Sequence, residues 1–318
     1  GGLALVAFAL RRYGRLEHEL AAVLAGAGAV GVVVVGLRGA FLGGAPPGAV
    51  VATLAGGGGA VMAYAVYLDL DRAALGAKGA ATLRGVAIGA LGIVAIYVWG
   101  FIAYAAVFFA VPGQLGSAGS TVVSTVASGL GTLSVVVLYL RYSERGWSYL
   151  DVRIPGLRGL AYAVGGTLAV LGGNLAIGLV FQRLGVESAT HTVVQTAEAD
   201  PSILLVLIPL SYLAIAPGEE LLYRNVIQKS LRERFSPVAG VVVASAVFAA
   251  VHLPAYSTPG SSFRATLSTL VVIFVLALVL GALYERTENV VVPILAHGTF
   301  NAIAFAVTYA QFTGQFVG

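Results

Sequence analysis

The stretch ATLSTLVVIFVLALVLGALY, residues 265–284, contains no charged residue and is rich in Leu, Val and Ile. A helix needs about 20 apolar residues to cross the hydrocarbon core of a bilayer, so this stretch predicts a transmembrane helix. Similar runs recur along the whole chain. The candidate spans are residues 1–10, 20–37, 48–68, 83–112, 120–140, 157–182, 202–234, 236–253, 265–284 and 290–310.

The composition of the chain agrees with this interpretation. Of 318 residues, 58% are hydrophobic and 10% are charged, and the mean hydropathy is +0.93. Soluble domains are about 45–50% apolar and about 25% charged. A water-soluble fold could not cover its surface with so few charges, which excludes soluble, disordered and nucleic-acid-binding proteins. We therefore predict an all-α, polytopic transmembrane helical bundle of about 8–10 spans.

The basic residues lie between the apolar runs, where they act as topology signals. The loops at 11–19, 69–84 and 141–156 are rich in Arg and Lys, whereas those at 38–47 and 113–119 are poor. The positive-inside rule predicts that the rich loops are cytoplasmic. The last two loops, which carry Arg264 and Arg286, do not discriminate. The preference for Arg over Lys and the abundance of Ala, Gly and Val favour a multi-pass protein of a prokaryotic plasma membrane.

Ionisable residues inside a span cost about 2.5–3.5 kcal/mol each at mid-depth, so they are functional candidates. The sequence has no cysteine, which excludes a thiolate nucleophile or metal ligand. The polar residues within spans concentrate in the last third of the chain. They are Glu219, Glu220, Arg224, His252, His297 and Asn301.

The two acidic residues follow Pro217-Gly218, which we expect to break the helix that begins near Ser202. Glu219 and Glu220 would then lie in the first turn of a new helix, where the helix dipole favours carboxylates. Glu220 and Arg224 are four residues apart and can pair. Glu219 has no obvious cation, which leaves it free to act as a base. The alternative is a helix-capping acidic pair with a buried ion pair and no catalytic role.

The histidines lie in positions that bring them toward the acidic pair. Glu219 lies 16 residues before Phe235, and His252 lies 16 after Ser236. At 1.5 Å per residue, each lies about 24 Å from that turn, so antiparallel helices place both at one depth. His297 and Asn301 are four residues apart and share one helix face; the alternative is a polar pair that joins two helices. We expect His18 and His191 to be solvated in loops.

Three motifs, Glu219-Glu220-x-x-x-Arg224, Phe248-x-x-x-His252 and His297-x-x-x-Asn301, together resemble the CPBP family. These are the type II CAAX prenyl endopeptidases, also called Abi or Rce1-like. The resemblance covers about residues 150–310, which suggests N-terminal transmembrane helices over 1–150, unassigned to a family, and a catalytic transmembrane domain over 151–318. It implies an intramembrane endopeptidase in which Glu219 deprotonates water and His252 holds that water. It further implies that Glu220 pairs with Arg224 and that His297 and Asn301 form the oxyanion hole.

Two alternatives remain open at this point. Glu219, His252 and His297 could instead hold Zn²⁺ with a position left for water, although the sequence has no His-Glu-x-x-His motif. We favour glutamate catalysis without a metal cofactor. Buried Glu and His also occur in non-catalytic transporters or scaffolds, and some members of the resembled family look like bacteriocin-immunity proteins. The expected partners are the lipid bilayer and a membrane-associated or prenylated peptide, not nucleic acid.

Overall fold

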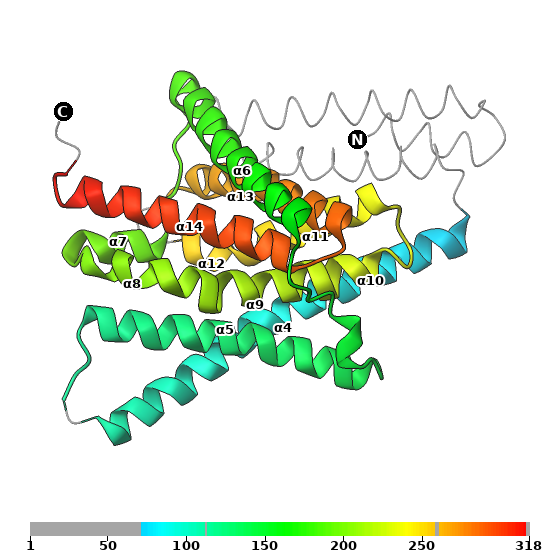
Figure 1. Ribbon diagram of the computed structural model, residues 1–318, viewed down its shortest axis with the longest axis horizontal. Helices are drawn as coiled ribbons and strands as arrows, with labels where there is room; N and C mark the ends of the chain where they lie inside the picture. Colours follow the sequence, from blue (N-terminus) through cyan, green and yellow to red (C-terminus); the bar gives the residue numbers. More distant parts are fainter. Residues whose placement is uncertain (1–70, 112, 258–260, 316–318) are drawn as a thin grey trace. The chain divides into compact units, whose positions relative to one another are not determined.

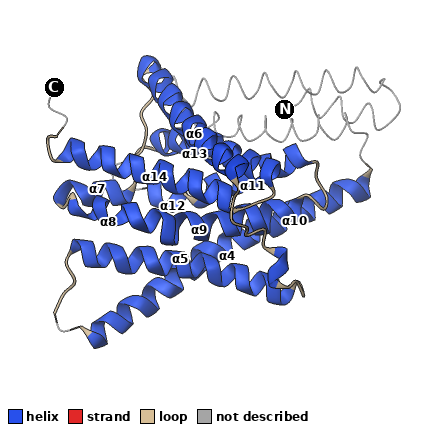
Figure 2. Cartoon of the chain, viewed as in Figure 1, coloured by secondary structure: helices blue, strands red, loops and turns tan. Residues whose placement is uncertain are grey.

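The computed structural model describes residues 71–111, 113–257 and 261–315 (Figure 1). The predicted spans at 1–10, 20–37 and 48–68, and His18, lie outside these residues. The chain divides into two compact units, one formed by residues 1–80 and 180–187 and the other by residues 81–179 and 188–318. The second unit contains the residues of interest. Helices and loops account for all of the described residues, with no strand among them (Figure 2).

The helices follow the predicted spans closely. The described elements are α4 (Arg72–Ala110), α5 (Ser117–Tyr142), η1 (Trp147–Tyr149), α6 (Leu157–Leu184), α7 (Thr192–Ala199), α8 (Ser202–Leu210), η2 (Ser211–Ile215), α9 (Ala216–Glu220), η3 (Leu221–Gln228), α10 (Lys229–Leu231), α11 (Pro237–Val251), α12 (Leu253–Tyr256), α13 (Phe263–Thr287) and α14 (Val291–Phe312). Elements α8 to α10 run on as one helix over Ser202–Leu231.

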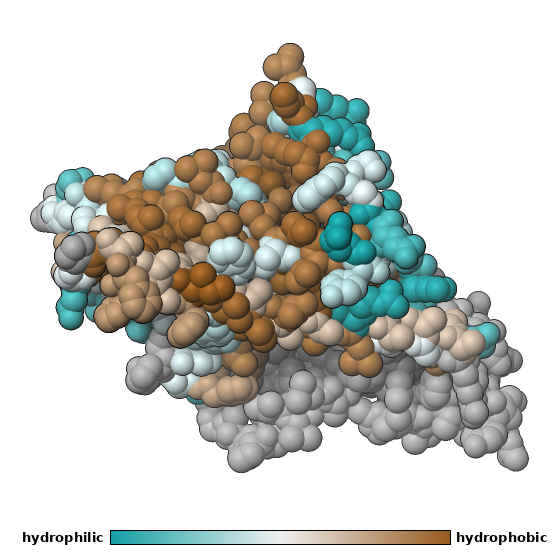
Figure 3. Space-filling model, turned by 90° about the horizontal axis from the view of Figure 1, so that it is seen from below, coloured by the Kyte–Doolittle hydropathy of each residue, from teal (hydrophilic) through white to brown (hydrophobic). Residues whose placement is uncertain are grey.

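Six of the described helices are long and apolar enough to cross a membrane, and α11 is a shorter apolar helix. The prediction of an all-α polytopic membrane bundle is therefore confirmed, and the protein is an integral, multi-pass membrane protein. Figure 3 shows a face of the described residues that is mostly hydrophobic, with hydrophilic side chains gathered densely at one side. Large apolar side chains are exposed along several spans, including Phe101, Phe108 and Val164, as expected of helices that face lipid.

The prediction that Pro217-Gly218 breaks the helix is wrong. A proline inside an α-helix removes one hydrogen bond and clashes with a preceding carbonyl. Here a π-helical turn, η2, comes directly before, and the Ala216 N–H donates to the carbonyl of Ser211, five residues back. This extra residue in the turn changes the register of the helix. Pro217 consequently lies at the start of α9, where a missing N–H is tolerated.

Gly218 has a packing role in place of the predicted break. A Cβ at Gly218 would collide with Oγ1 of Thr132 on α5, so only glycine permits this approach. On the same side, a Cβ at Gly129 of α5 would lie 3.1 Å from Cβ of Ala214. By contrast, Gly76 and Gly100 face open space. Some glycines therefore serve close helix packing, as small residues do in membrane bundles, whereas others have no contact that requires them.

Hydrogen bonds group the loops at the two ends of the second unit. The Val290 N–H donates to the carbonyl of Asp151, 2.9 Å away, which places the turn that follows Arg286 beside the 141–156 loop. The Ala189 N–H donates to the carbonyl of Ala265 at 3.1 Å, which places the start of α13 beside the 183–201 loop. These contacts place Arg286 and Arg264 at opposite ends of the second unit. The number of basic residues in each loop did not decide this.

A polar cluster around Asp151 joins three segments at the first of these ends. Its Oδ2 accepts hydrogen bonds from Lys229 Nζ at 2.7 Å, from the Tyr284 hydroxyl at 2.6 Å and from Asn225 Nδ2 at 3.2 Å. Burial raises the pKa of Asp151, but the hydrogen bonds from Lys229 and Tyr284 outweigh it and hold the pKa below its usual value. The ionised carboxylate therefore ties the loop before α6 to α10 and α13.

We predict that Asp151→Ala lowers the free energy of unfolding by about 1–3 kcal/mol, because it leaves buried donors without their acceptor. Thermal unfolding of the purified protein in detergent measures this. Because the pKa of Asp151 is lowered, its contribution is present above the unfolded pKa of about 3.9 and is lost as the pH falls below it. Arg153→Gln is the control, since Arg153 lies 3.9 Å from Asp151 and is 68% exposed. Equal losses from both variants would contradict the role of the cluster.

Candidate active site

Glu220 is the most enclosed charged group among the candidate residues. Its side chain is fully buried, and each of its oxygens has a partner. Oε2 accepts from Nε of Arg224 at 2.9 Å, and Oε1 accepts from Nδ1 of His297 at 2.9 Å. The first contact spans one helical turn, whereas the second joins α9 to α14. Glu220 therefore fixes Arg224 and His297 in position at once.

Glu219, the neighbouring carboxylate, has a different environment. Its side chain is 23% exposed, whereas that of Glu220 is not exposed at all. Its Oε2 lies 3.9 Å from Nε2 of His297, too far for a hydrogen bond. Within the described residues, no hydrogen bond engages the Glu219 carboxylate. It remains available to accept a proton or a hydrogen bond from a small molecule.

The ring of Phe248 lies between the candidate residues. The Arg224 guanidinium carbon lies 5.0 Å from the ring centroid, within the range of a cation–π contact. His252 and His297 contact the same ring, with centroid distances of 4.6 Å and 6.3 Å. Tyr223 packs on it edge to face at 5.0 Å. Phe248 thus provides an apolar wall that holds both imidazoles and the guanidinium.

The Arg224 guanidinium depends on this wall. Its two terminal nitrogens are buried and find no hydrogen-bond partner among the described residues. Buried donors without partners are costly, and the aromatic face offsets part of this cost. The position of Phe248 four residues before His252 therefore stabilises the ion pair as well as the histidine.

His252 closes α11, and its ring orientation is fixed by its own helix. Its Nδ1 lies 2.7 Å from the carbonyl oxygen of Phe248. A carbonyl can only accept, so Nδ1 carries a proton, and in the neutral form of the ring Nε2 presents a lone pair. Tyr223 and Phe248, one turn from Glu219 and His252 respectively, are in contact, so the two functional candidates lie at similar levels of their helices.

Asn301 lies one turn after His297 on α14 and is half-buried. No hydrogen bond to its side chain occurs among the described residues. The structure thus joins Glu220, Arg224 and His297 directly and joins His252 to them through Phe248. Glu219 lies 3.9 Å from His297 without a hydrogen bond. The structure places Asn301 on the same helix as His297, and the Asn301 side chain has no hydrogen-bond partner among the described residues.

Two side chains near this cluster were missed by the sequence analysis. His191, expected to be solvated, is partly buried and packs against Tyr256 edge to face at 4.9 Å. Burial, and secondarily the charge of His252, lowers the pKa of His191 to about 4. Burial, and then the negative charge of Glu219, raises the pKa of Tyr256 to about 12. Tyr256 follows His252 by four residues, and this spacing was the available signal; His191 had none.

The candidate zinc ligands do not form a metal-binding cluster. Within the described residues, no three side chains of His, Cys, Asp or Glu are arranged to hold a metal ion. Nδ1 of His297 is engaged by Glu220, and Nδ1 of His252 is engaged by a carbonyl. Among the described residues, these contacts leave Nε2 of both rings without a hydrogen bond, an arrangement that suits water binding and metal ligation alike.

Comparison with protein families gives a match over part of the chain. Residues 201–303 match the family described as type II CAAX prenyl endopeptidase Rce1-like. Searches of curated proteins and of solved structures gave no match. The family match confirms the resemblance inferred from the three motifs, and all six candidate residues lie within it. Residues 201–303 are thus similar to this family, and the match supports a function of the CAAX-type membrane endopeptidase kind.

We predict that Glu220→Ala and Arg224→Ala each lower the free energy of unfolding by about 3–5 kcal/mol, because each removes one partner of a fully buried ion pair. The double variant should lose less than the sum of the two single losses. Thermal unfolding of the three variants in detergent completes the double-mutant cycle. The exposed pair Arg145 and Glu233 is the control, with an expected coupling below about 1 kcal/mol. Strict additivity at Glu220 and Arg224 would contradict the assigned interaction.

Proposed function

We propose that this protein cleaves a peptide bond of a membrane-associated or prenylated substrate with a water molecule activated by Glu219. The observation that carries the proposal is the contrast between two adjacent carboxylates. Both oxygens of Glu220 are occupied within a closed interior, whereas Glu219 is partly exposed and free of hydrogen bonds among the described residues. A general base must reach a water molecule, and of the two carboxylates only Glu219 meets that condition.

His252 would hold the attacking water together with Glu219. Its Nδ1–H donates to the Phe248 carbonyl, so its Nε2 can accept a hydrogen from water. Two acceptors on one water direct a lone pair of its oxygen toward the substrate. Glu219 then takes the proton as the oxygen attacks the peptide carbonyl.

His297 and Asn301 would stabilise the oxygen that becomes negative in the transition state. His297 donates from Nδ1 to Glu220, and a protonated ring also has a donor at Nε2. Asn301 adds a neutral amide donor one turn along α14. Donors held in place before the reaction are the main source of such stabilisation.

The charges of this arrangement balance. The proposed mechanism requires both carboxylates to be ionised and His297 to be protonated, so that two negative charges face the two positive charges of Arg224 and His297. A neutral cluster costs less to bury than an unpaired charge. When Glu219 takes the water proton, its negative charge moves to the substrate oxygen beside His297. The reaction therefore moves charge within the cluster without changing its total.

The substrate class follows from the bilayer and from the family. Peptide or prenylated protein substrates reach a site within membrane spans through the lipid phase, and the family description names prenyl endopeptidases. A prokaryotic plasma membrane is the proposed location. Metal-free glutamate catalysis is the proposed mechanism, and a zinc mechanism is the alternative that kinetics must exclude.

We predict that Glu219→Gln lowers kcat by at least about 10²-fold, the usual contribution of a positioned general base, while the protein stays folded. Cleavage of a fluorogenic prenylated peptide by the purified protein measures this. Glu198→Gln, in the exposed part of α7, is the matched control and should keep wild-type turnover. If Glu219→Gln turned over substrate at the wild-type rate, Glu219 would not be the base.

We predict that Asn301→Ala lowers kcat by about 10²–10³-fold with little change in KM, because the amide acts on the transition state. Steady-state kinetics with and without excess Zn²⁺ check both parts. In a zinc enzyme, loss of a supporting residue weakens metal affinity by about 10–100-fold, so added zinc would restore activity. Rescue by zinc would overturn the metal-free mechanism, and an unchanged kcat would overturn the oxyanion role.

A further inference from the structure

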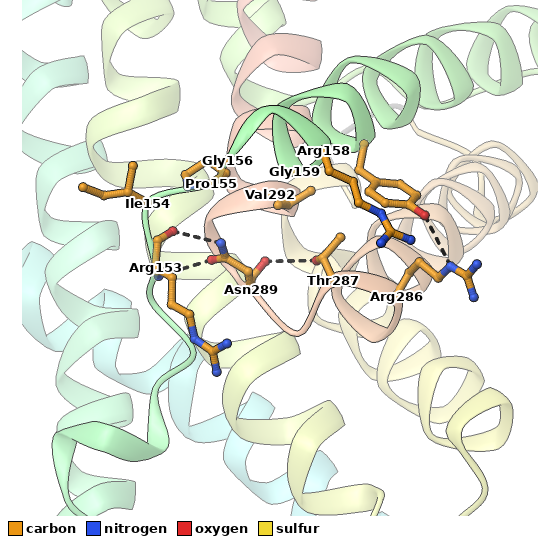
Figure 4. Close-up of a pocket in the computed structure, with 11 residues that line it drawn as sticks. Arg153, Ile154, Pro155, Gly156, Arg158, Gly159, Arg286, Thr287, Asn289 and Val292 are labelled. Atoms are coloured by element: carbon orange, nitrogen blue, oxygen red, sulfur yellow. Dashed lines mark hydrogen bonds between the residues drawn. The ribbon is translucent and has the colours of Figure 1, made fainter.

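A pocket outside the candidate active site lies where three helix ends meet. It has a volume of about 300 Å³ and lies at the start of α6, the end of α13 and the start of α14. Figure 4 shows its lining residues, with Asn289 bridging to the backbone of Arg153. The side chain of Asn289 also accepts the Val291 N–H at the start of α14. The pocket is thus built on a fixed turn.

The lining is strongly basic. Arg153, Arg158 and Arg286 line the pocket, and no acidic residue occurs among its described lining residues. Arg286 donates from Nε to the Tyr162 hydroxyl at 3.4 Å, and the Arg158 guanidinium lies 5.7 Å from the Tyr162 ring centroid. In Figure 4 the side chains of Arg158 and Arg286 extend toward the same side, whereas that of Arg153 is directed away from them.

Arg158 and Arg286 have no carboxylate partner among the described residues. The acidic residues next to Arg286 in the sequence are committed elsewhere, since Glu285 and Glu288 pair with Arg232 at 3.3 Å and 3.5 Å. Two guanidinium groups beside one tyrosine hydroxyl form an uncompensated positive site. Guanidinium groups bind phosphate oxygens in a forked geometry, which makes a phosphate group the complementary ligand.

The surroundings of the pocket indicate whether that phosphate belongs to a lipid or to a soluble molecule. Leu157, Leu160, Val164 and Leu168 lie three or four residues apart on α6 and are 88%, 43%, 61% and 63% exposed. These side chains show that α6 faces lipid. At about 100° per residue they lie on the side of the helix away from Arg158, Gly159 and Tyr162, which line the pocket. Because the pocket lies at the ends of spans, its depth is that of lipid headgroups. Its loop also belongs to the Arg-rich end, predicted to be cytoplasmic, where anionic lipids concentrate.

We propose that this pocket binds the phosphate headgroup of an anionic phospholipid, with Arg158 and Arg286 as phosphate ligands. This site is distinct from the cluster around Glu220 and does not depend on the proposed catalytic mechanism. It assigns a structural lipid to the junction of α6, α13 and α14.

The test is native mass spectrometry of the full chain in detergent, titrated with phosphatidylglycerol, phosphatidylcholine or glycerol 3-phosphate. The wild-type protein should retain phosphatidylglycerol and bind the other two at least tenfold more weakly. Arg158→Gln and Arg286→Gln should each weaken phosphatidylglycerol binding about fivefold, and their double variant about 25-fold, the contribution of one basic residue near an anionic headgroup. Arg141→Gln, exposed in the last turn of α5 at the same end, is the control and should bind as the wild type does.

Three results would overturn the proposal. Equal retention of phosphatidylcholine would show that the headgroup charge is not recognised. Equal binding of glycerol 3-phosphate would show a site for soluble phosphate rather than lipid. A loss in Arg141→Gln as large as in the pocket variants would show a general effect of surface charge. The single variants decide the question if the double variant does not fold, and circular dichroism of each variant in detergent checks its helical content.

Discussion

The buried contact of Glu220 with Arg224 and His297 is the constraint on which the functional region depends. A carboxylate without partners in a bilayer interior would not remain ionised, so both partners must be in place before the charge is tolerated. Arg224 comes from the same helix, but His297 comes from α14, 77 residues later. The helices α9 and α14 must therefore pack in one register for the cluster to form. Phe248 of α11 then completes the enclosure, since it contacts both basic side chains.

Hydropathy and the spacing of residues along a helix predicted much of this arrangement from the sequence. Apolar runs located the described spans, because helix length and lipid contact leave few alternatives. The spacing of Glu220 and Arg224 predicted their ion pair, because residues four apart share a helix face. The contact of Glu220 with His297 was beyond such rules, since it depends on how distant helices pack. The burial of His191 could not be predicted either, because it depends on the contact of His191 with Tyr256, 65 residues later.

The prediction at Pro217-Gly218 failed for a related reason. In a span that is apolar on all sides, hydropathy carries no periodic signal to distinguish an α-turn from a π-turn. Proline and glycine were therefore interpreted by their usual effect in soluble helices. The structure satisfies both residues without a break, Pro217 by its place at the start of α9 and Gly218 by the closeness of Thr132. Tertiary packing thus overrode the local preference.

The π-helical turn at 211–215 has a consequence for how sequences of this kind can change. Each residue of an α-helix turns the chain by about 100°, so a wider turn behaves as an inserted residue that rotates everything after it. Deleting one residue from this turn would restore an ordinary helix and swing Glu219 and Glu220 to another face of the bundle. Such a deletion leaves hydropathy and every motif intact, yet it separates Glu220 from His297. In an alignment of related sequences, a single-residue gap in this stretch therefore indicates that the residues after it face another side of the bundle.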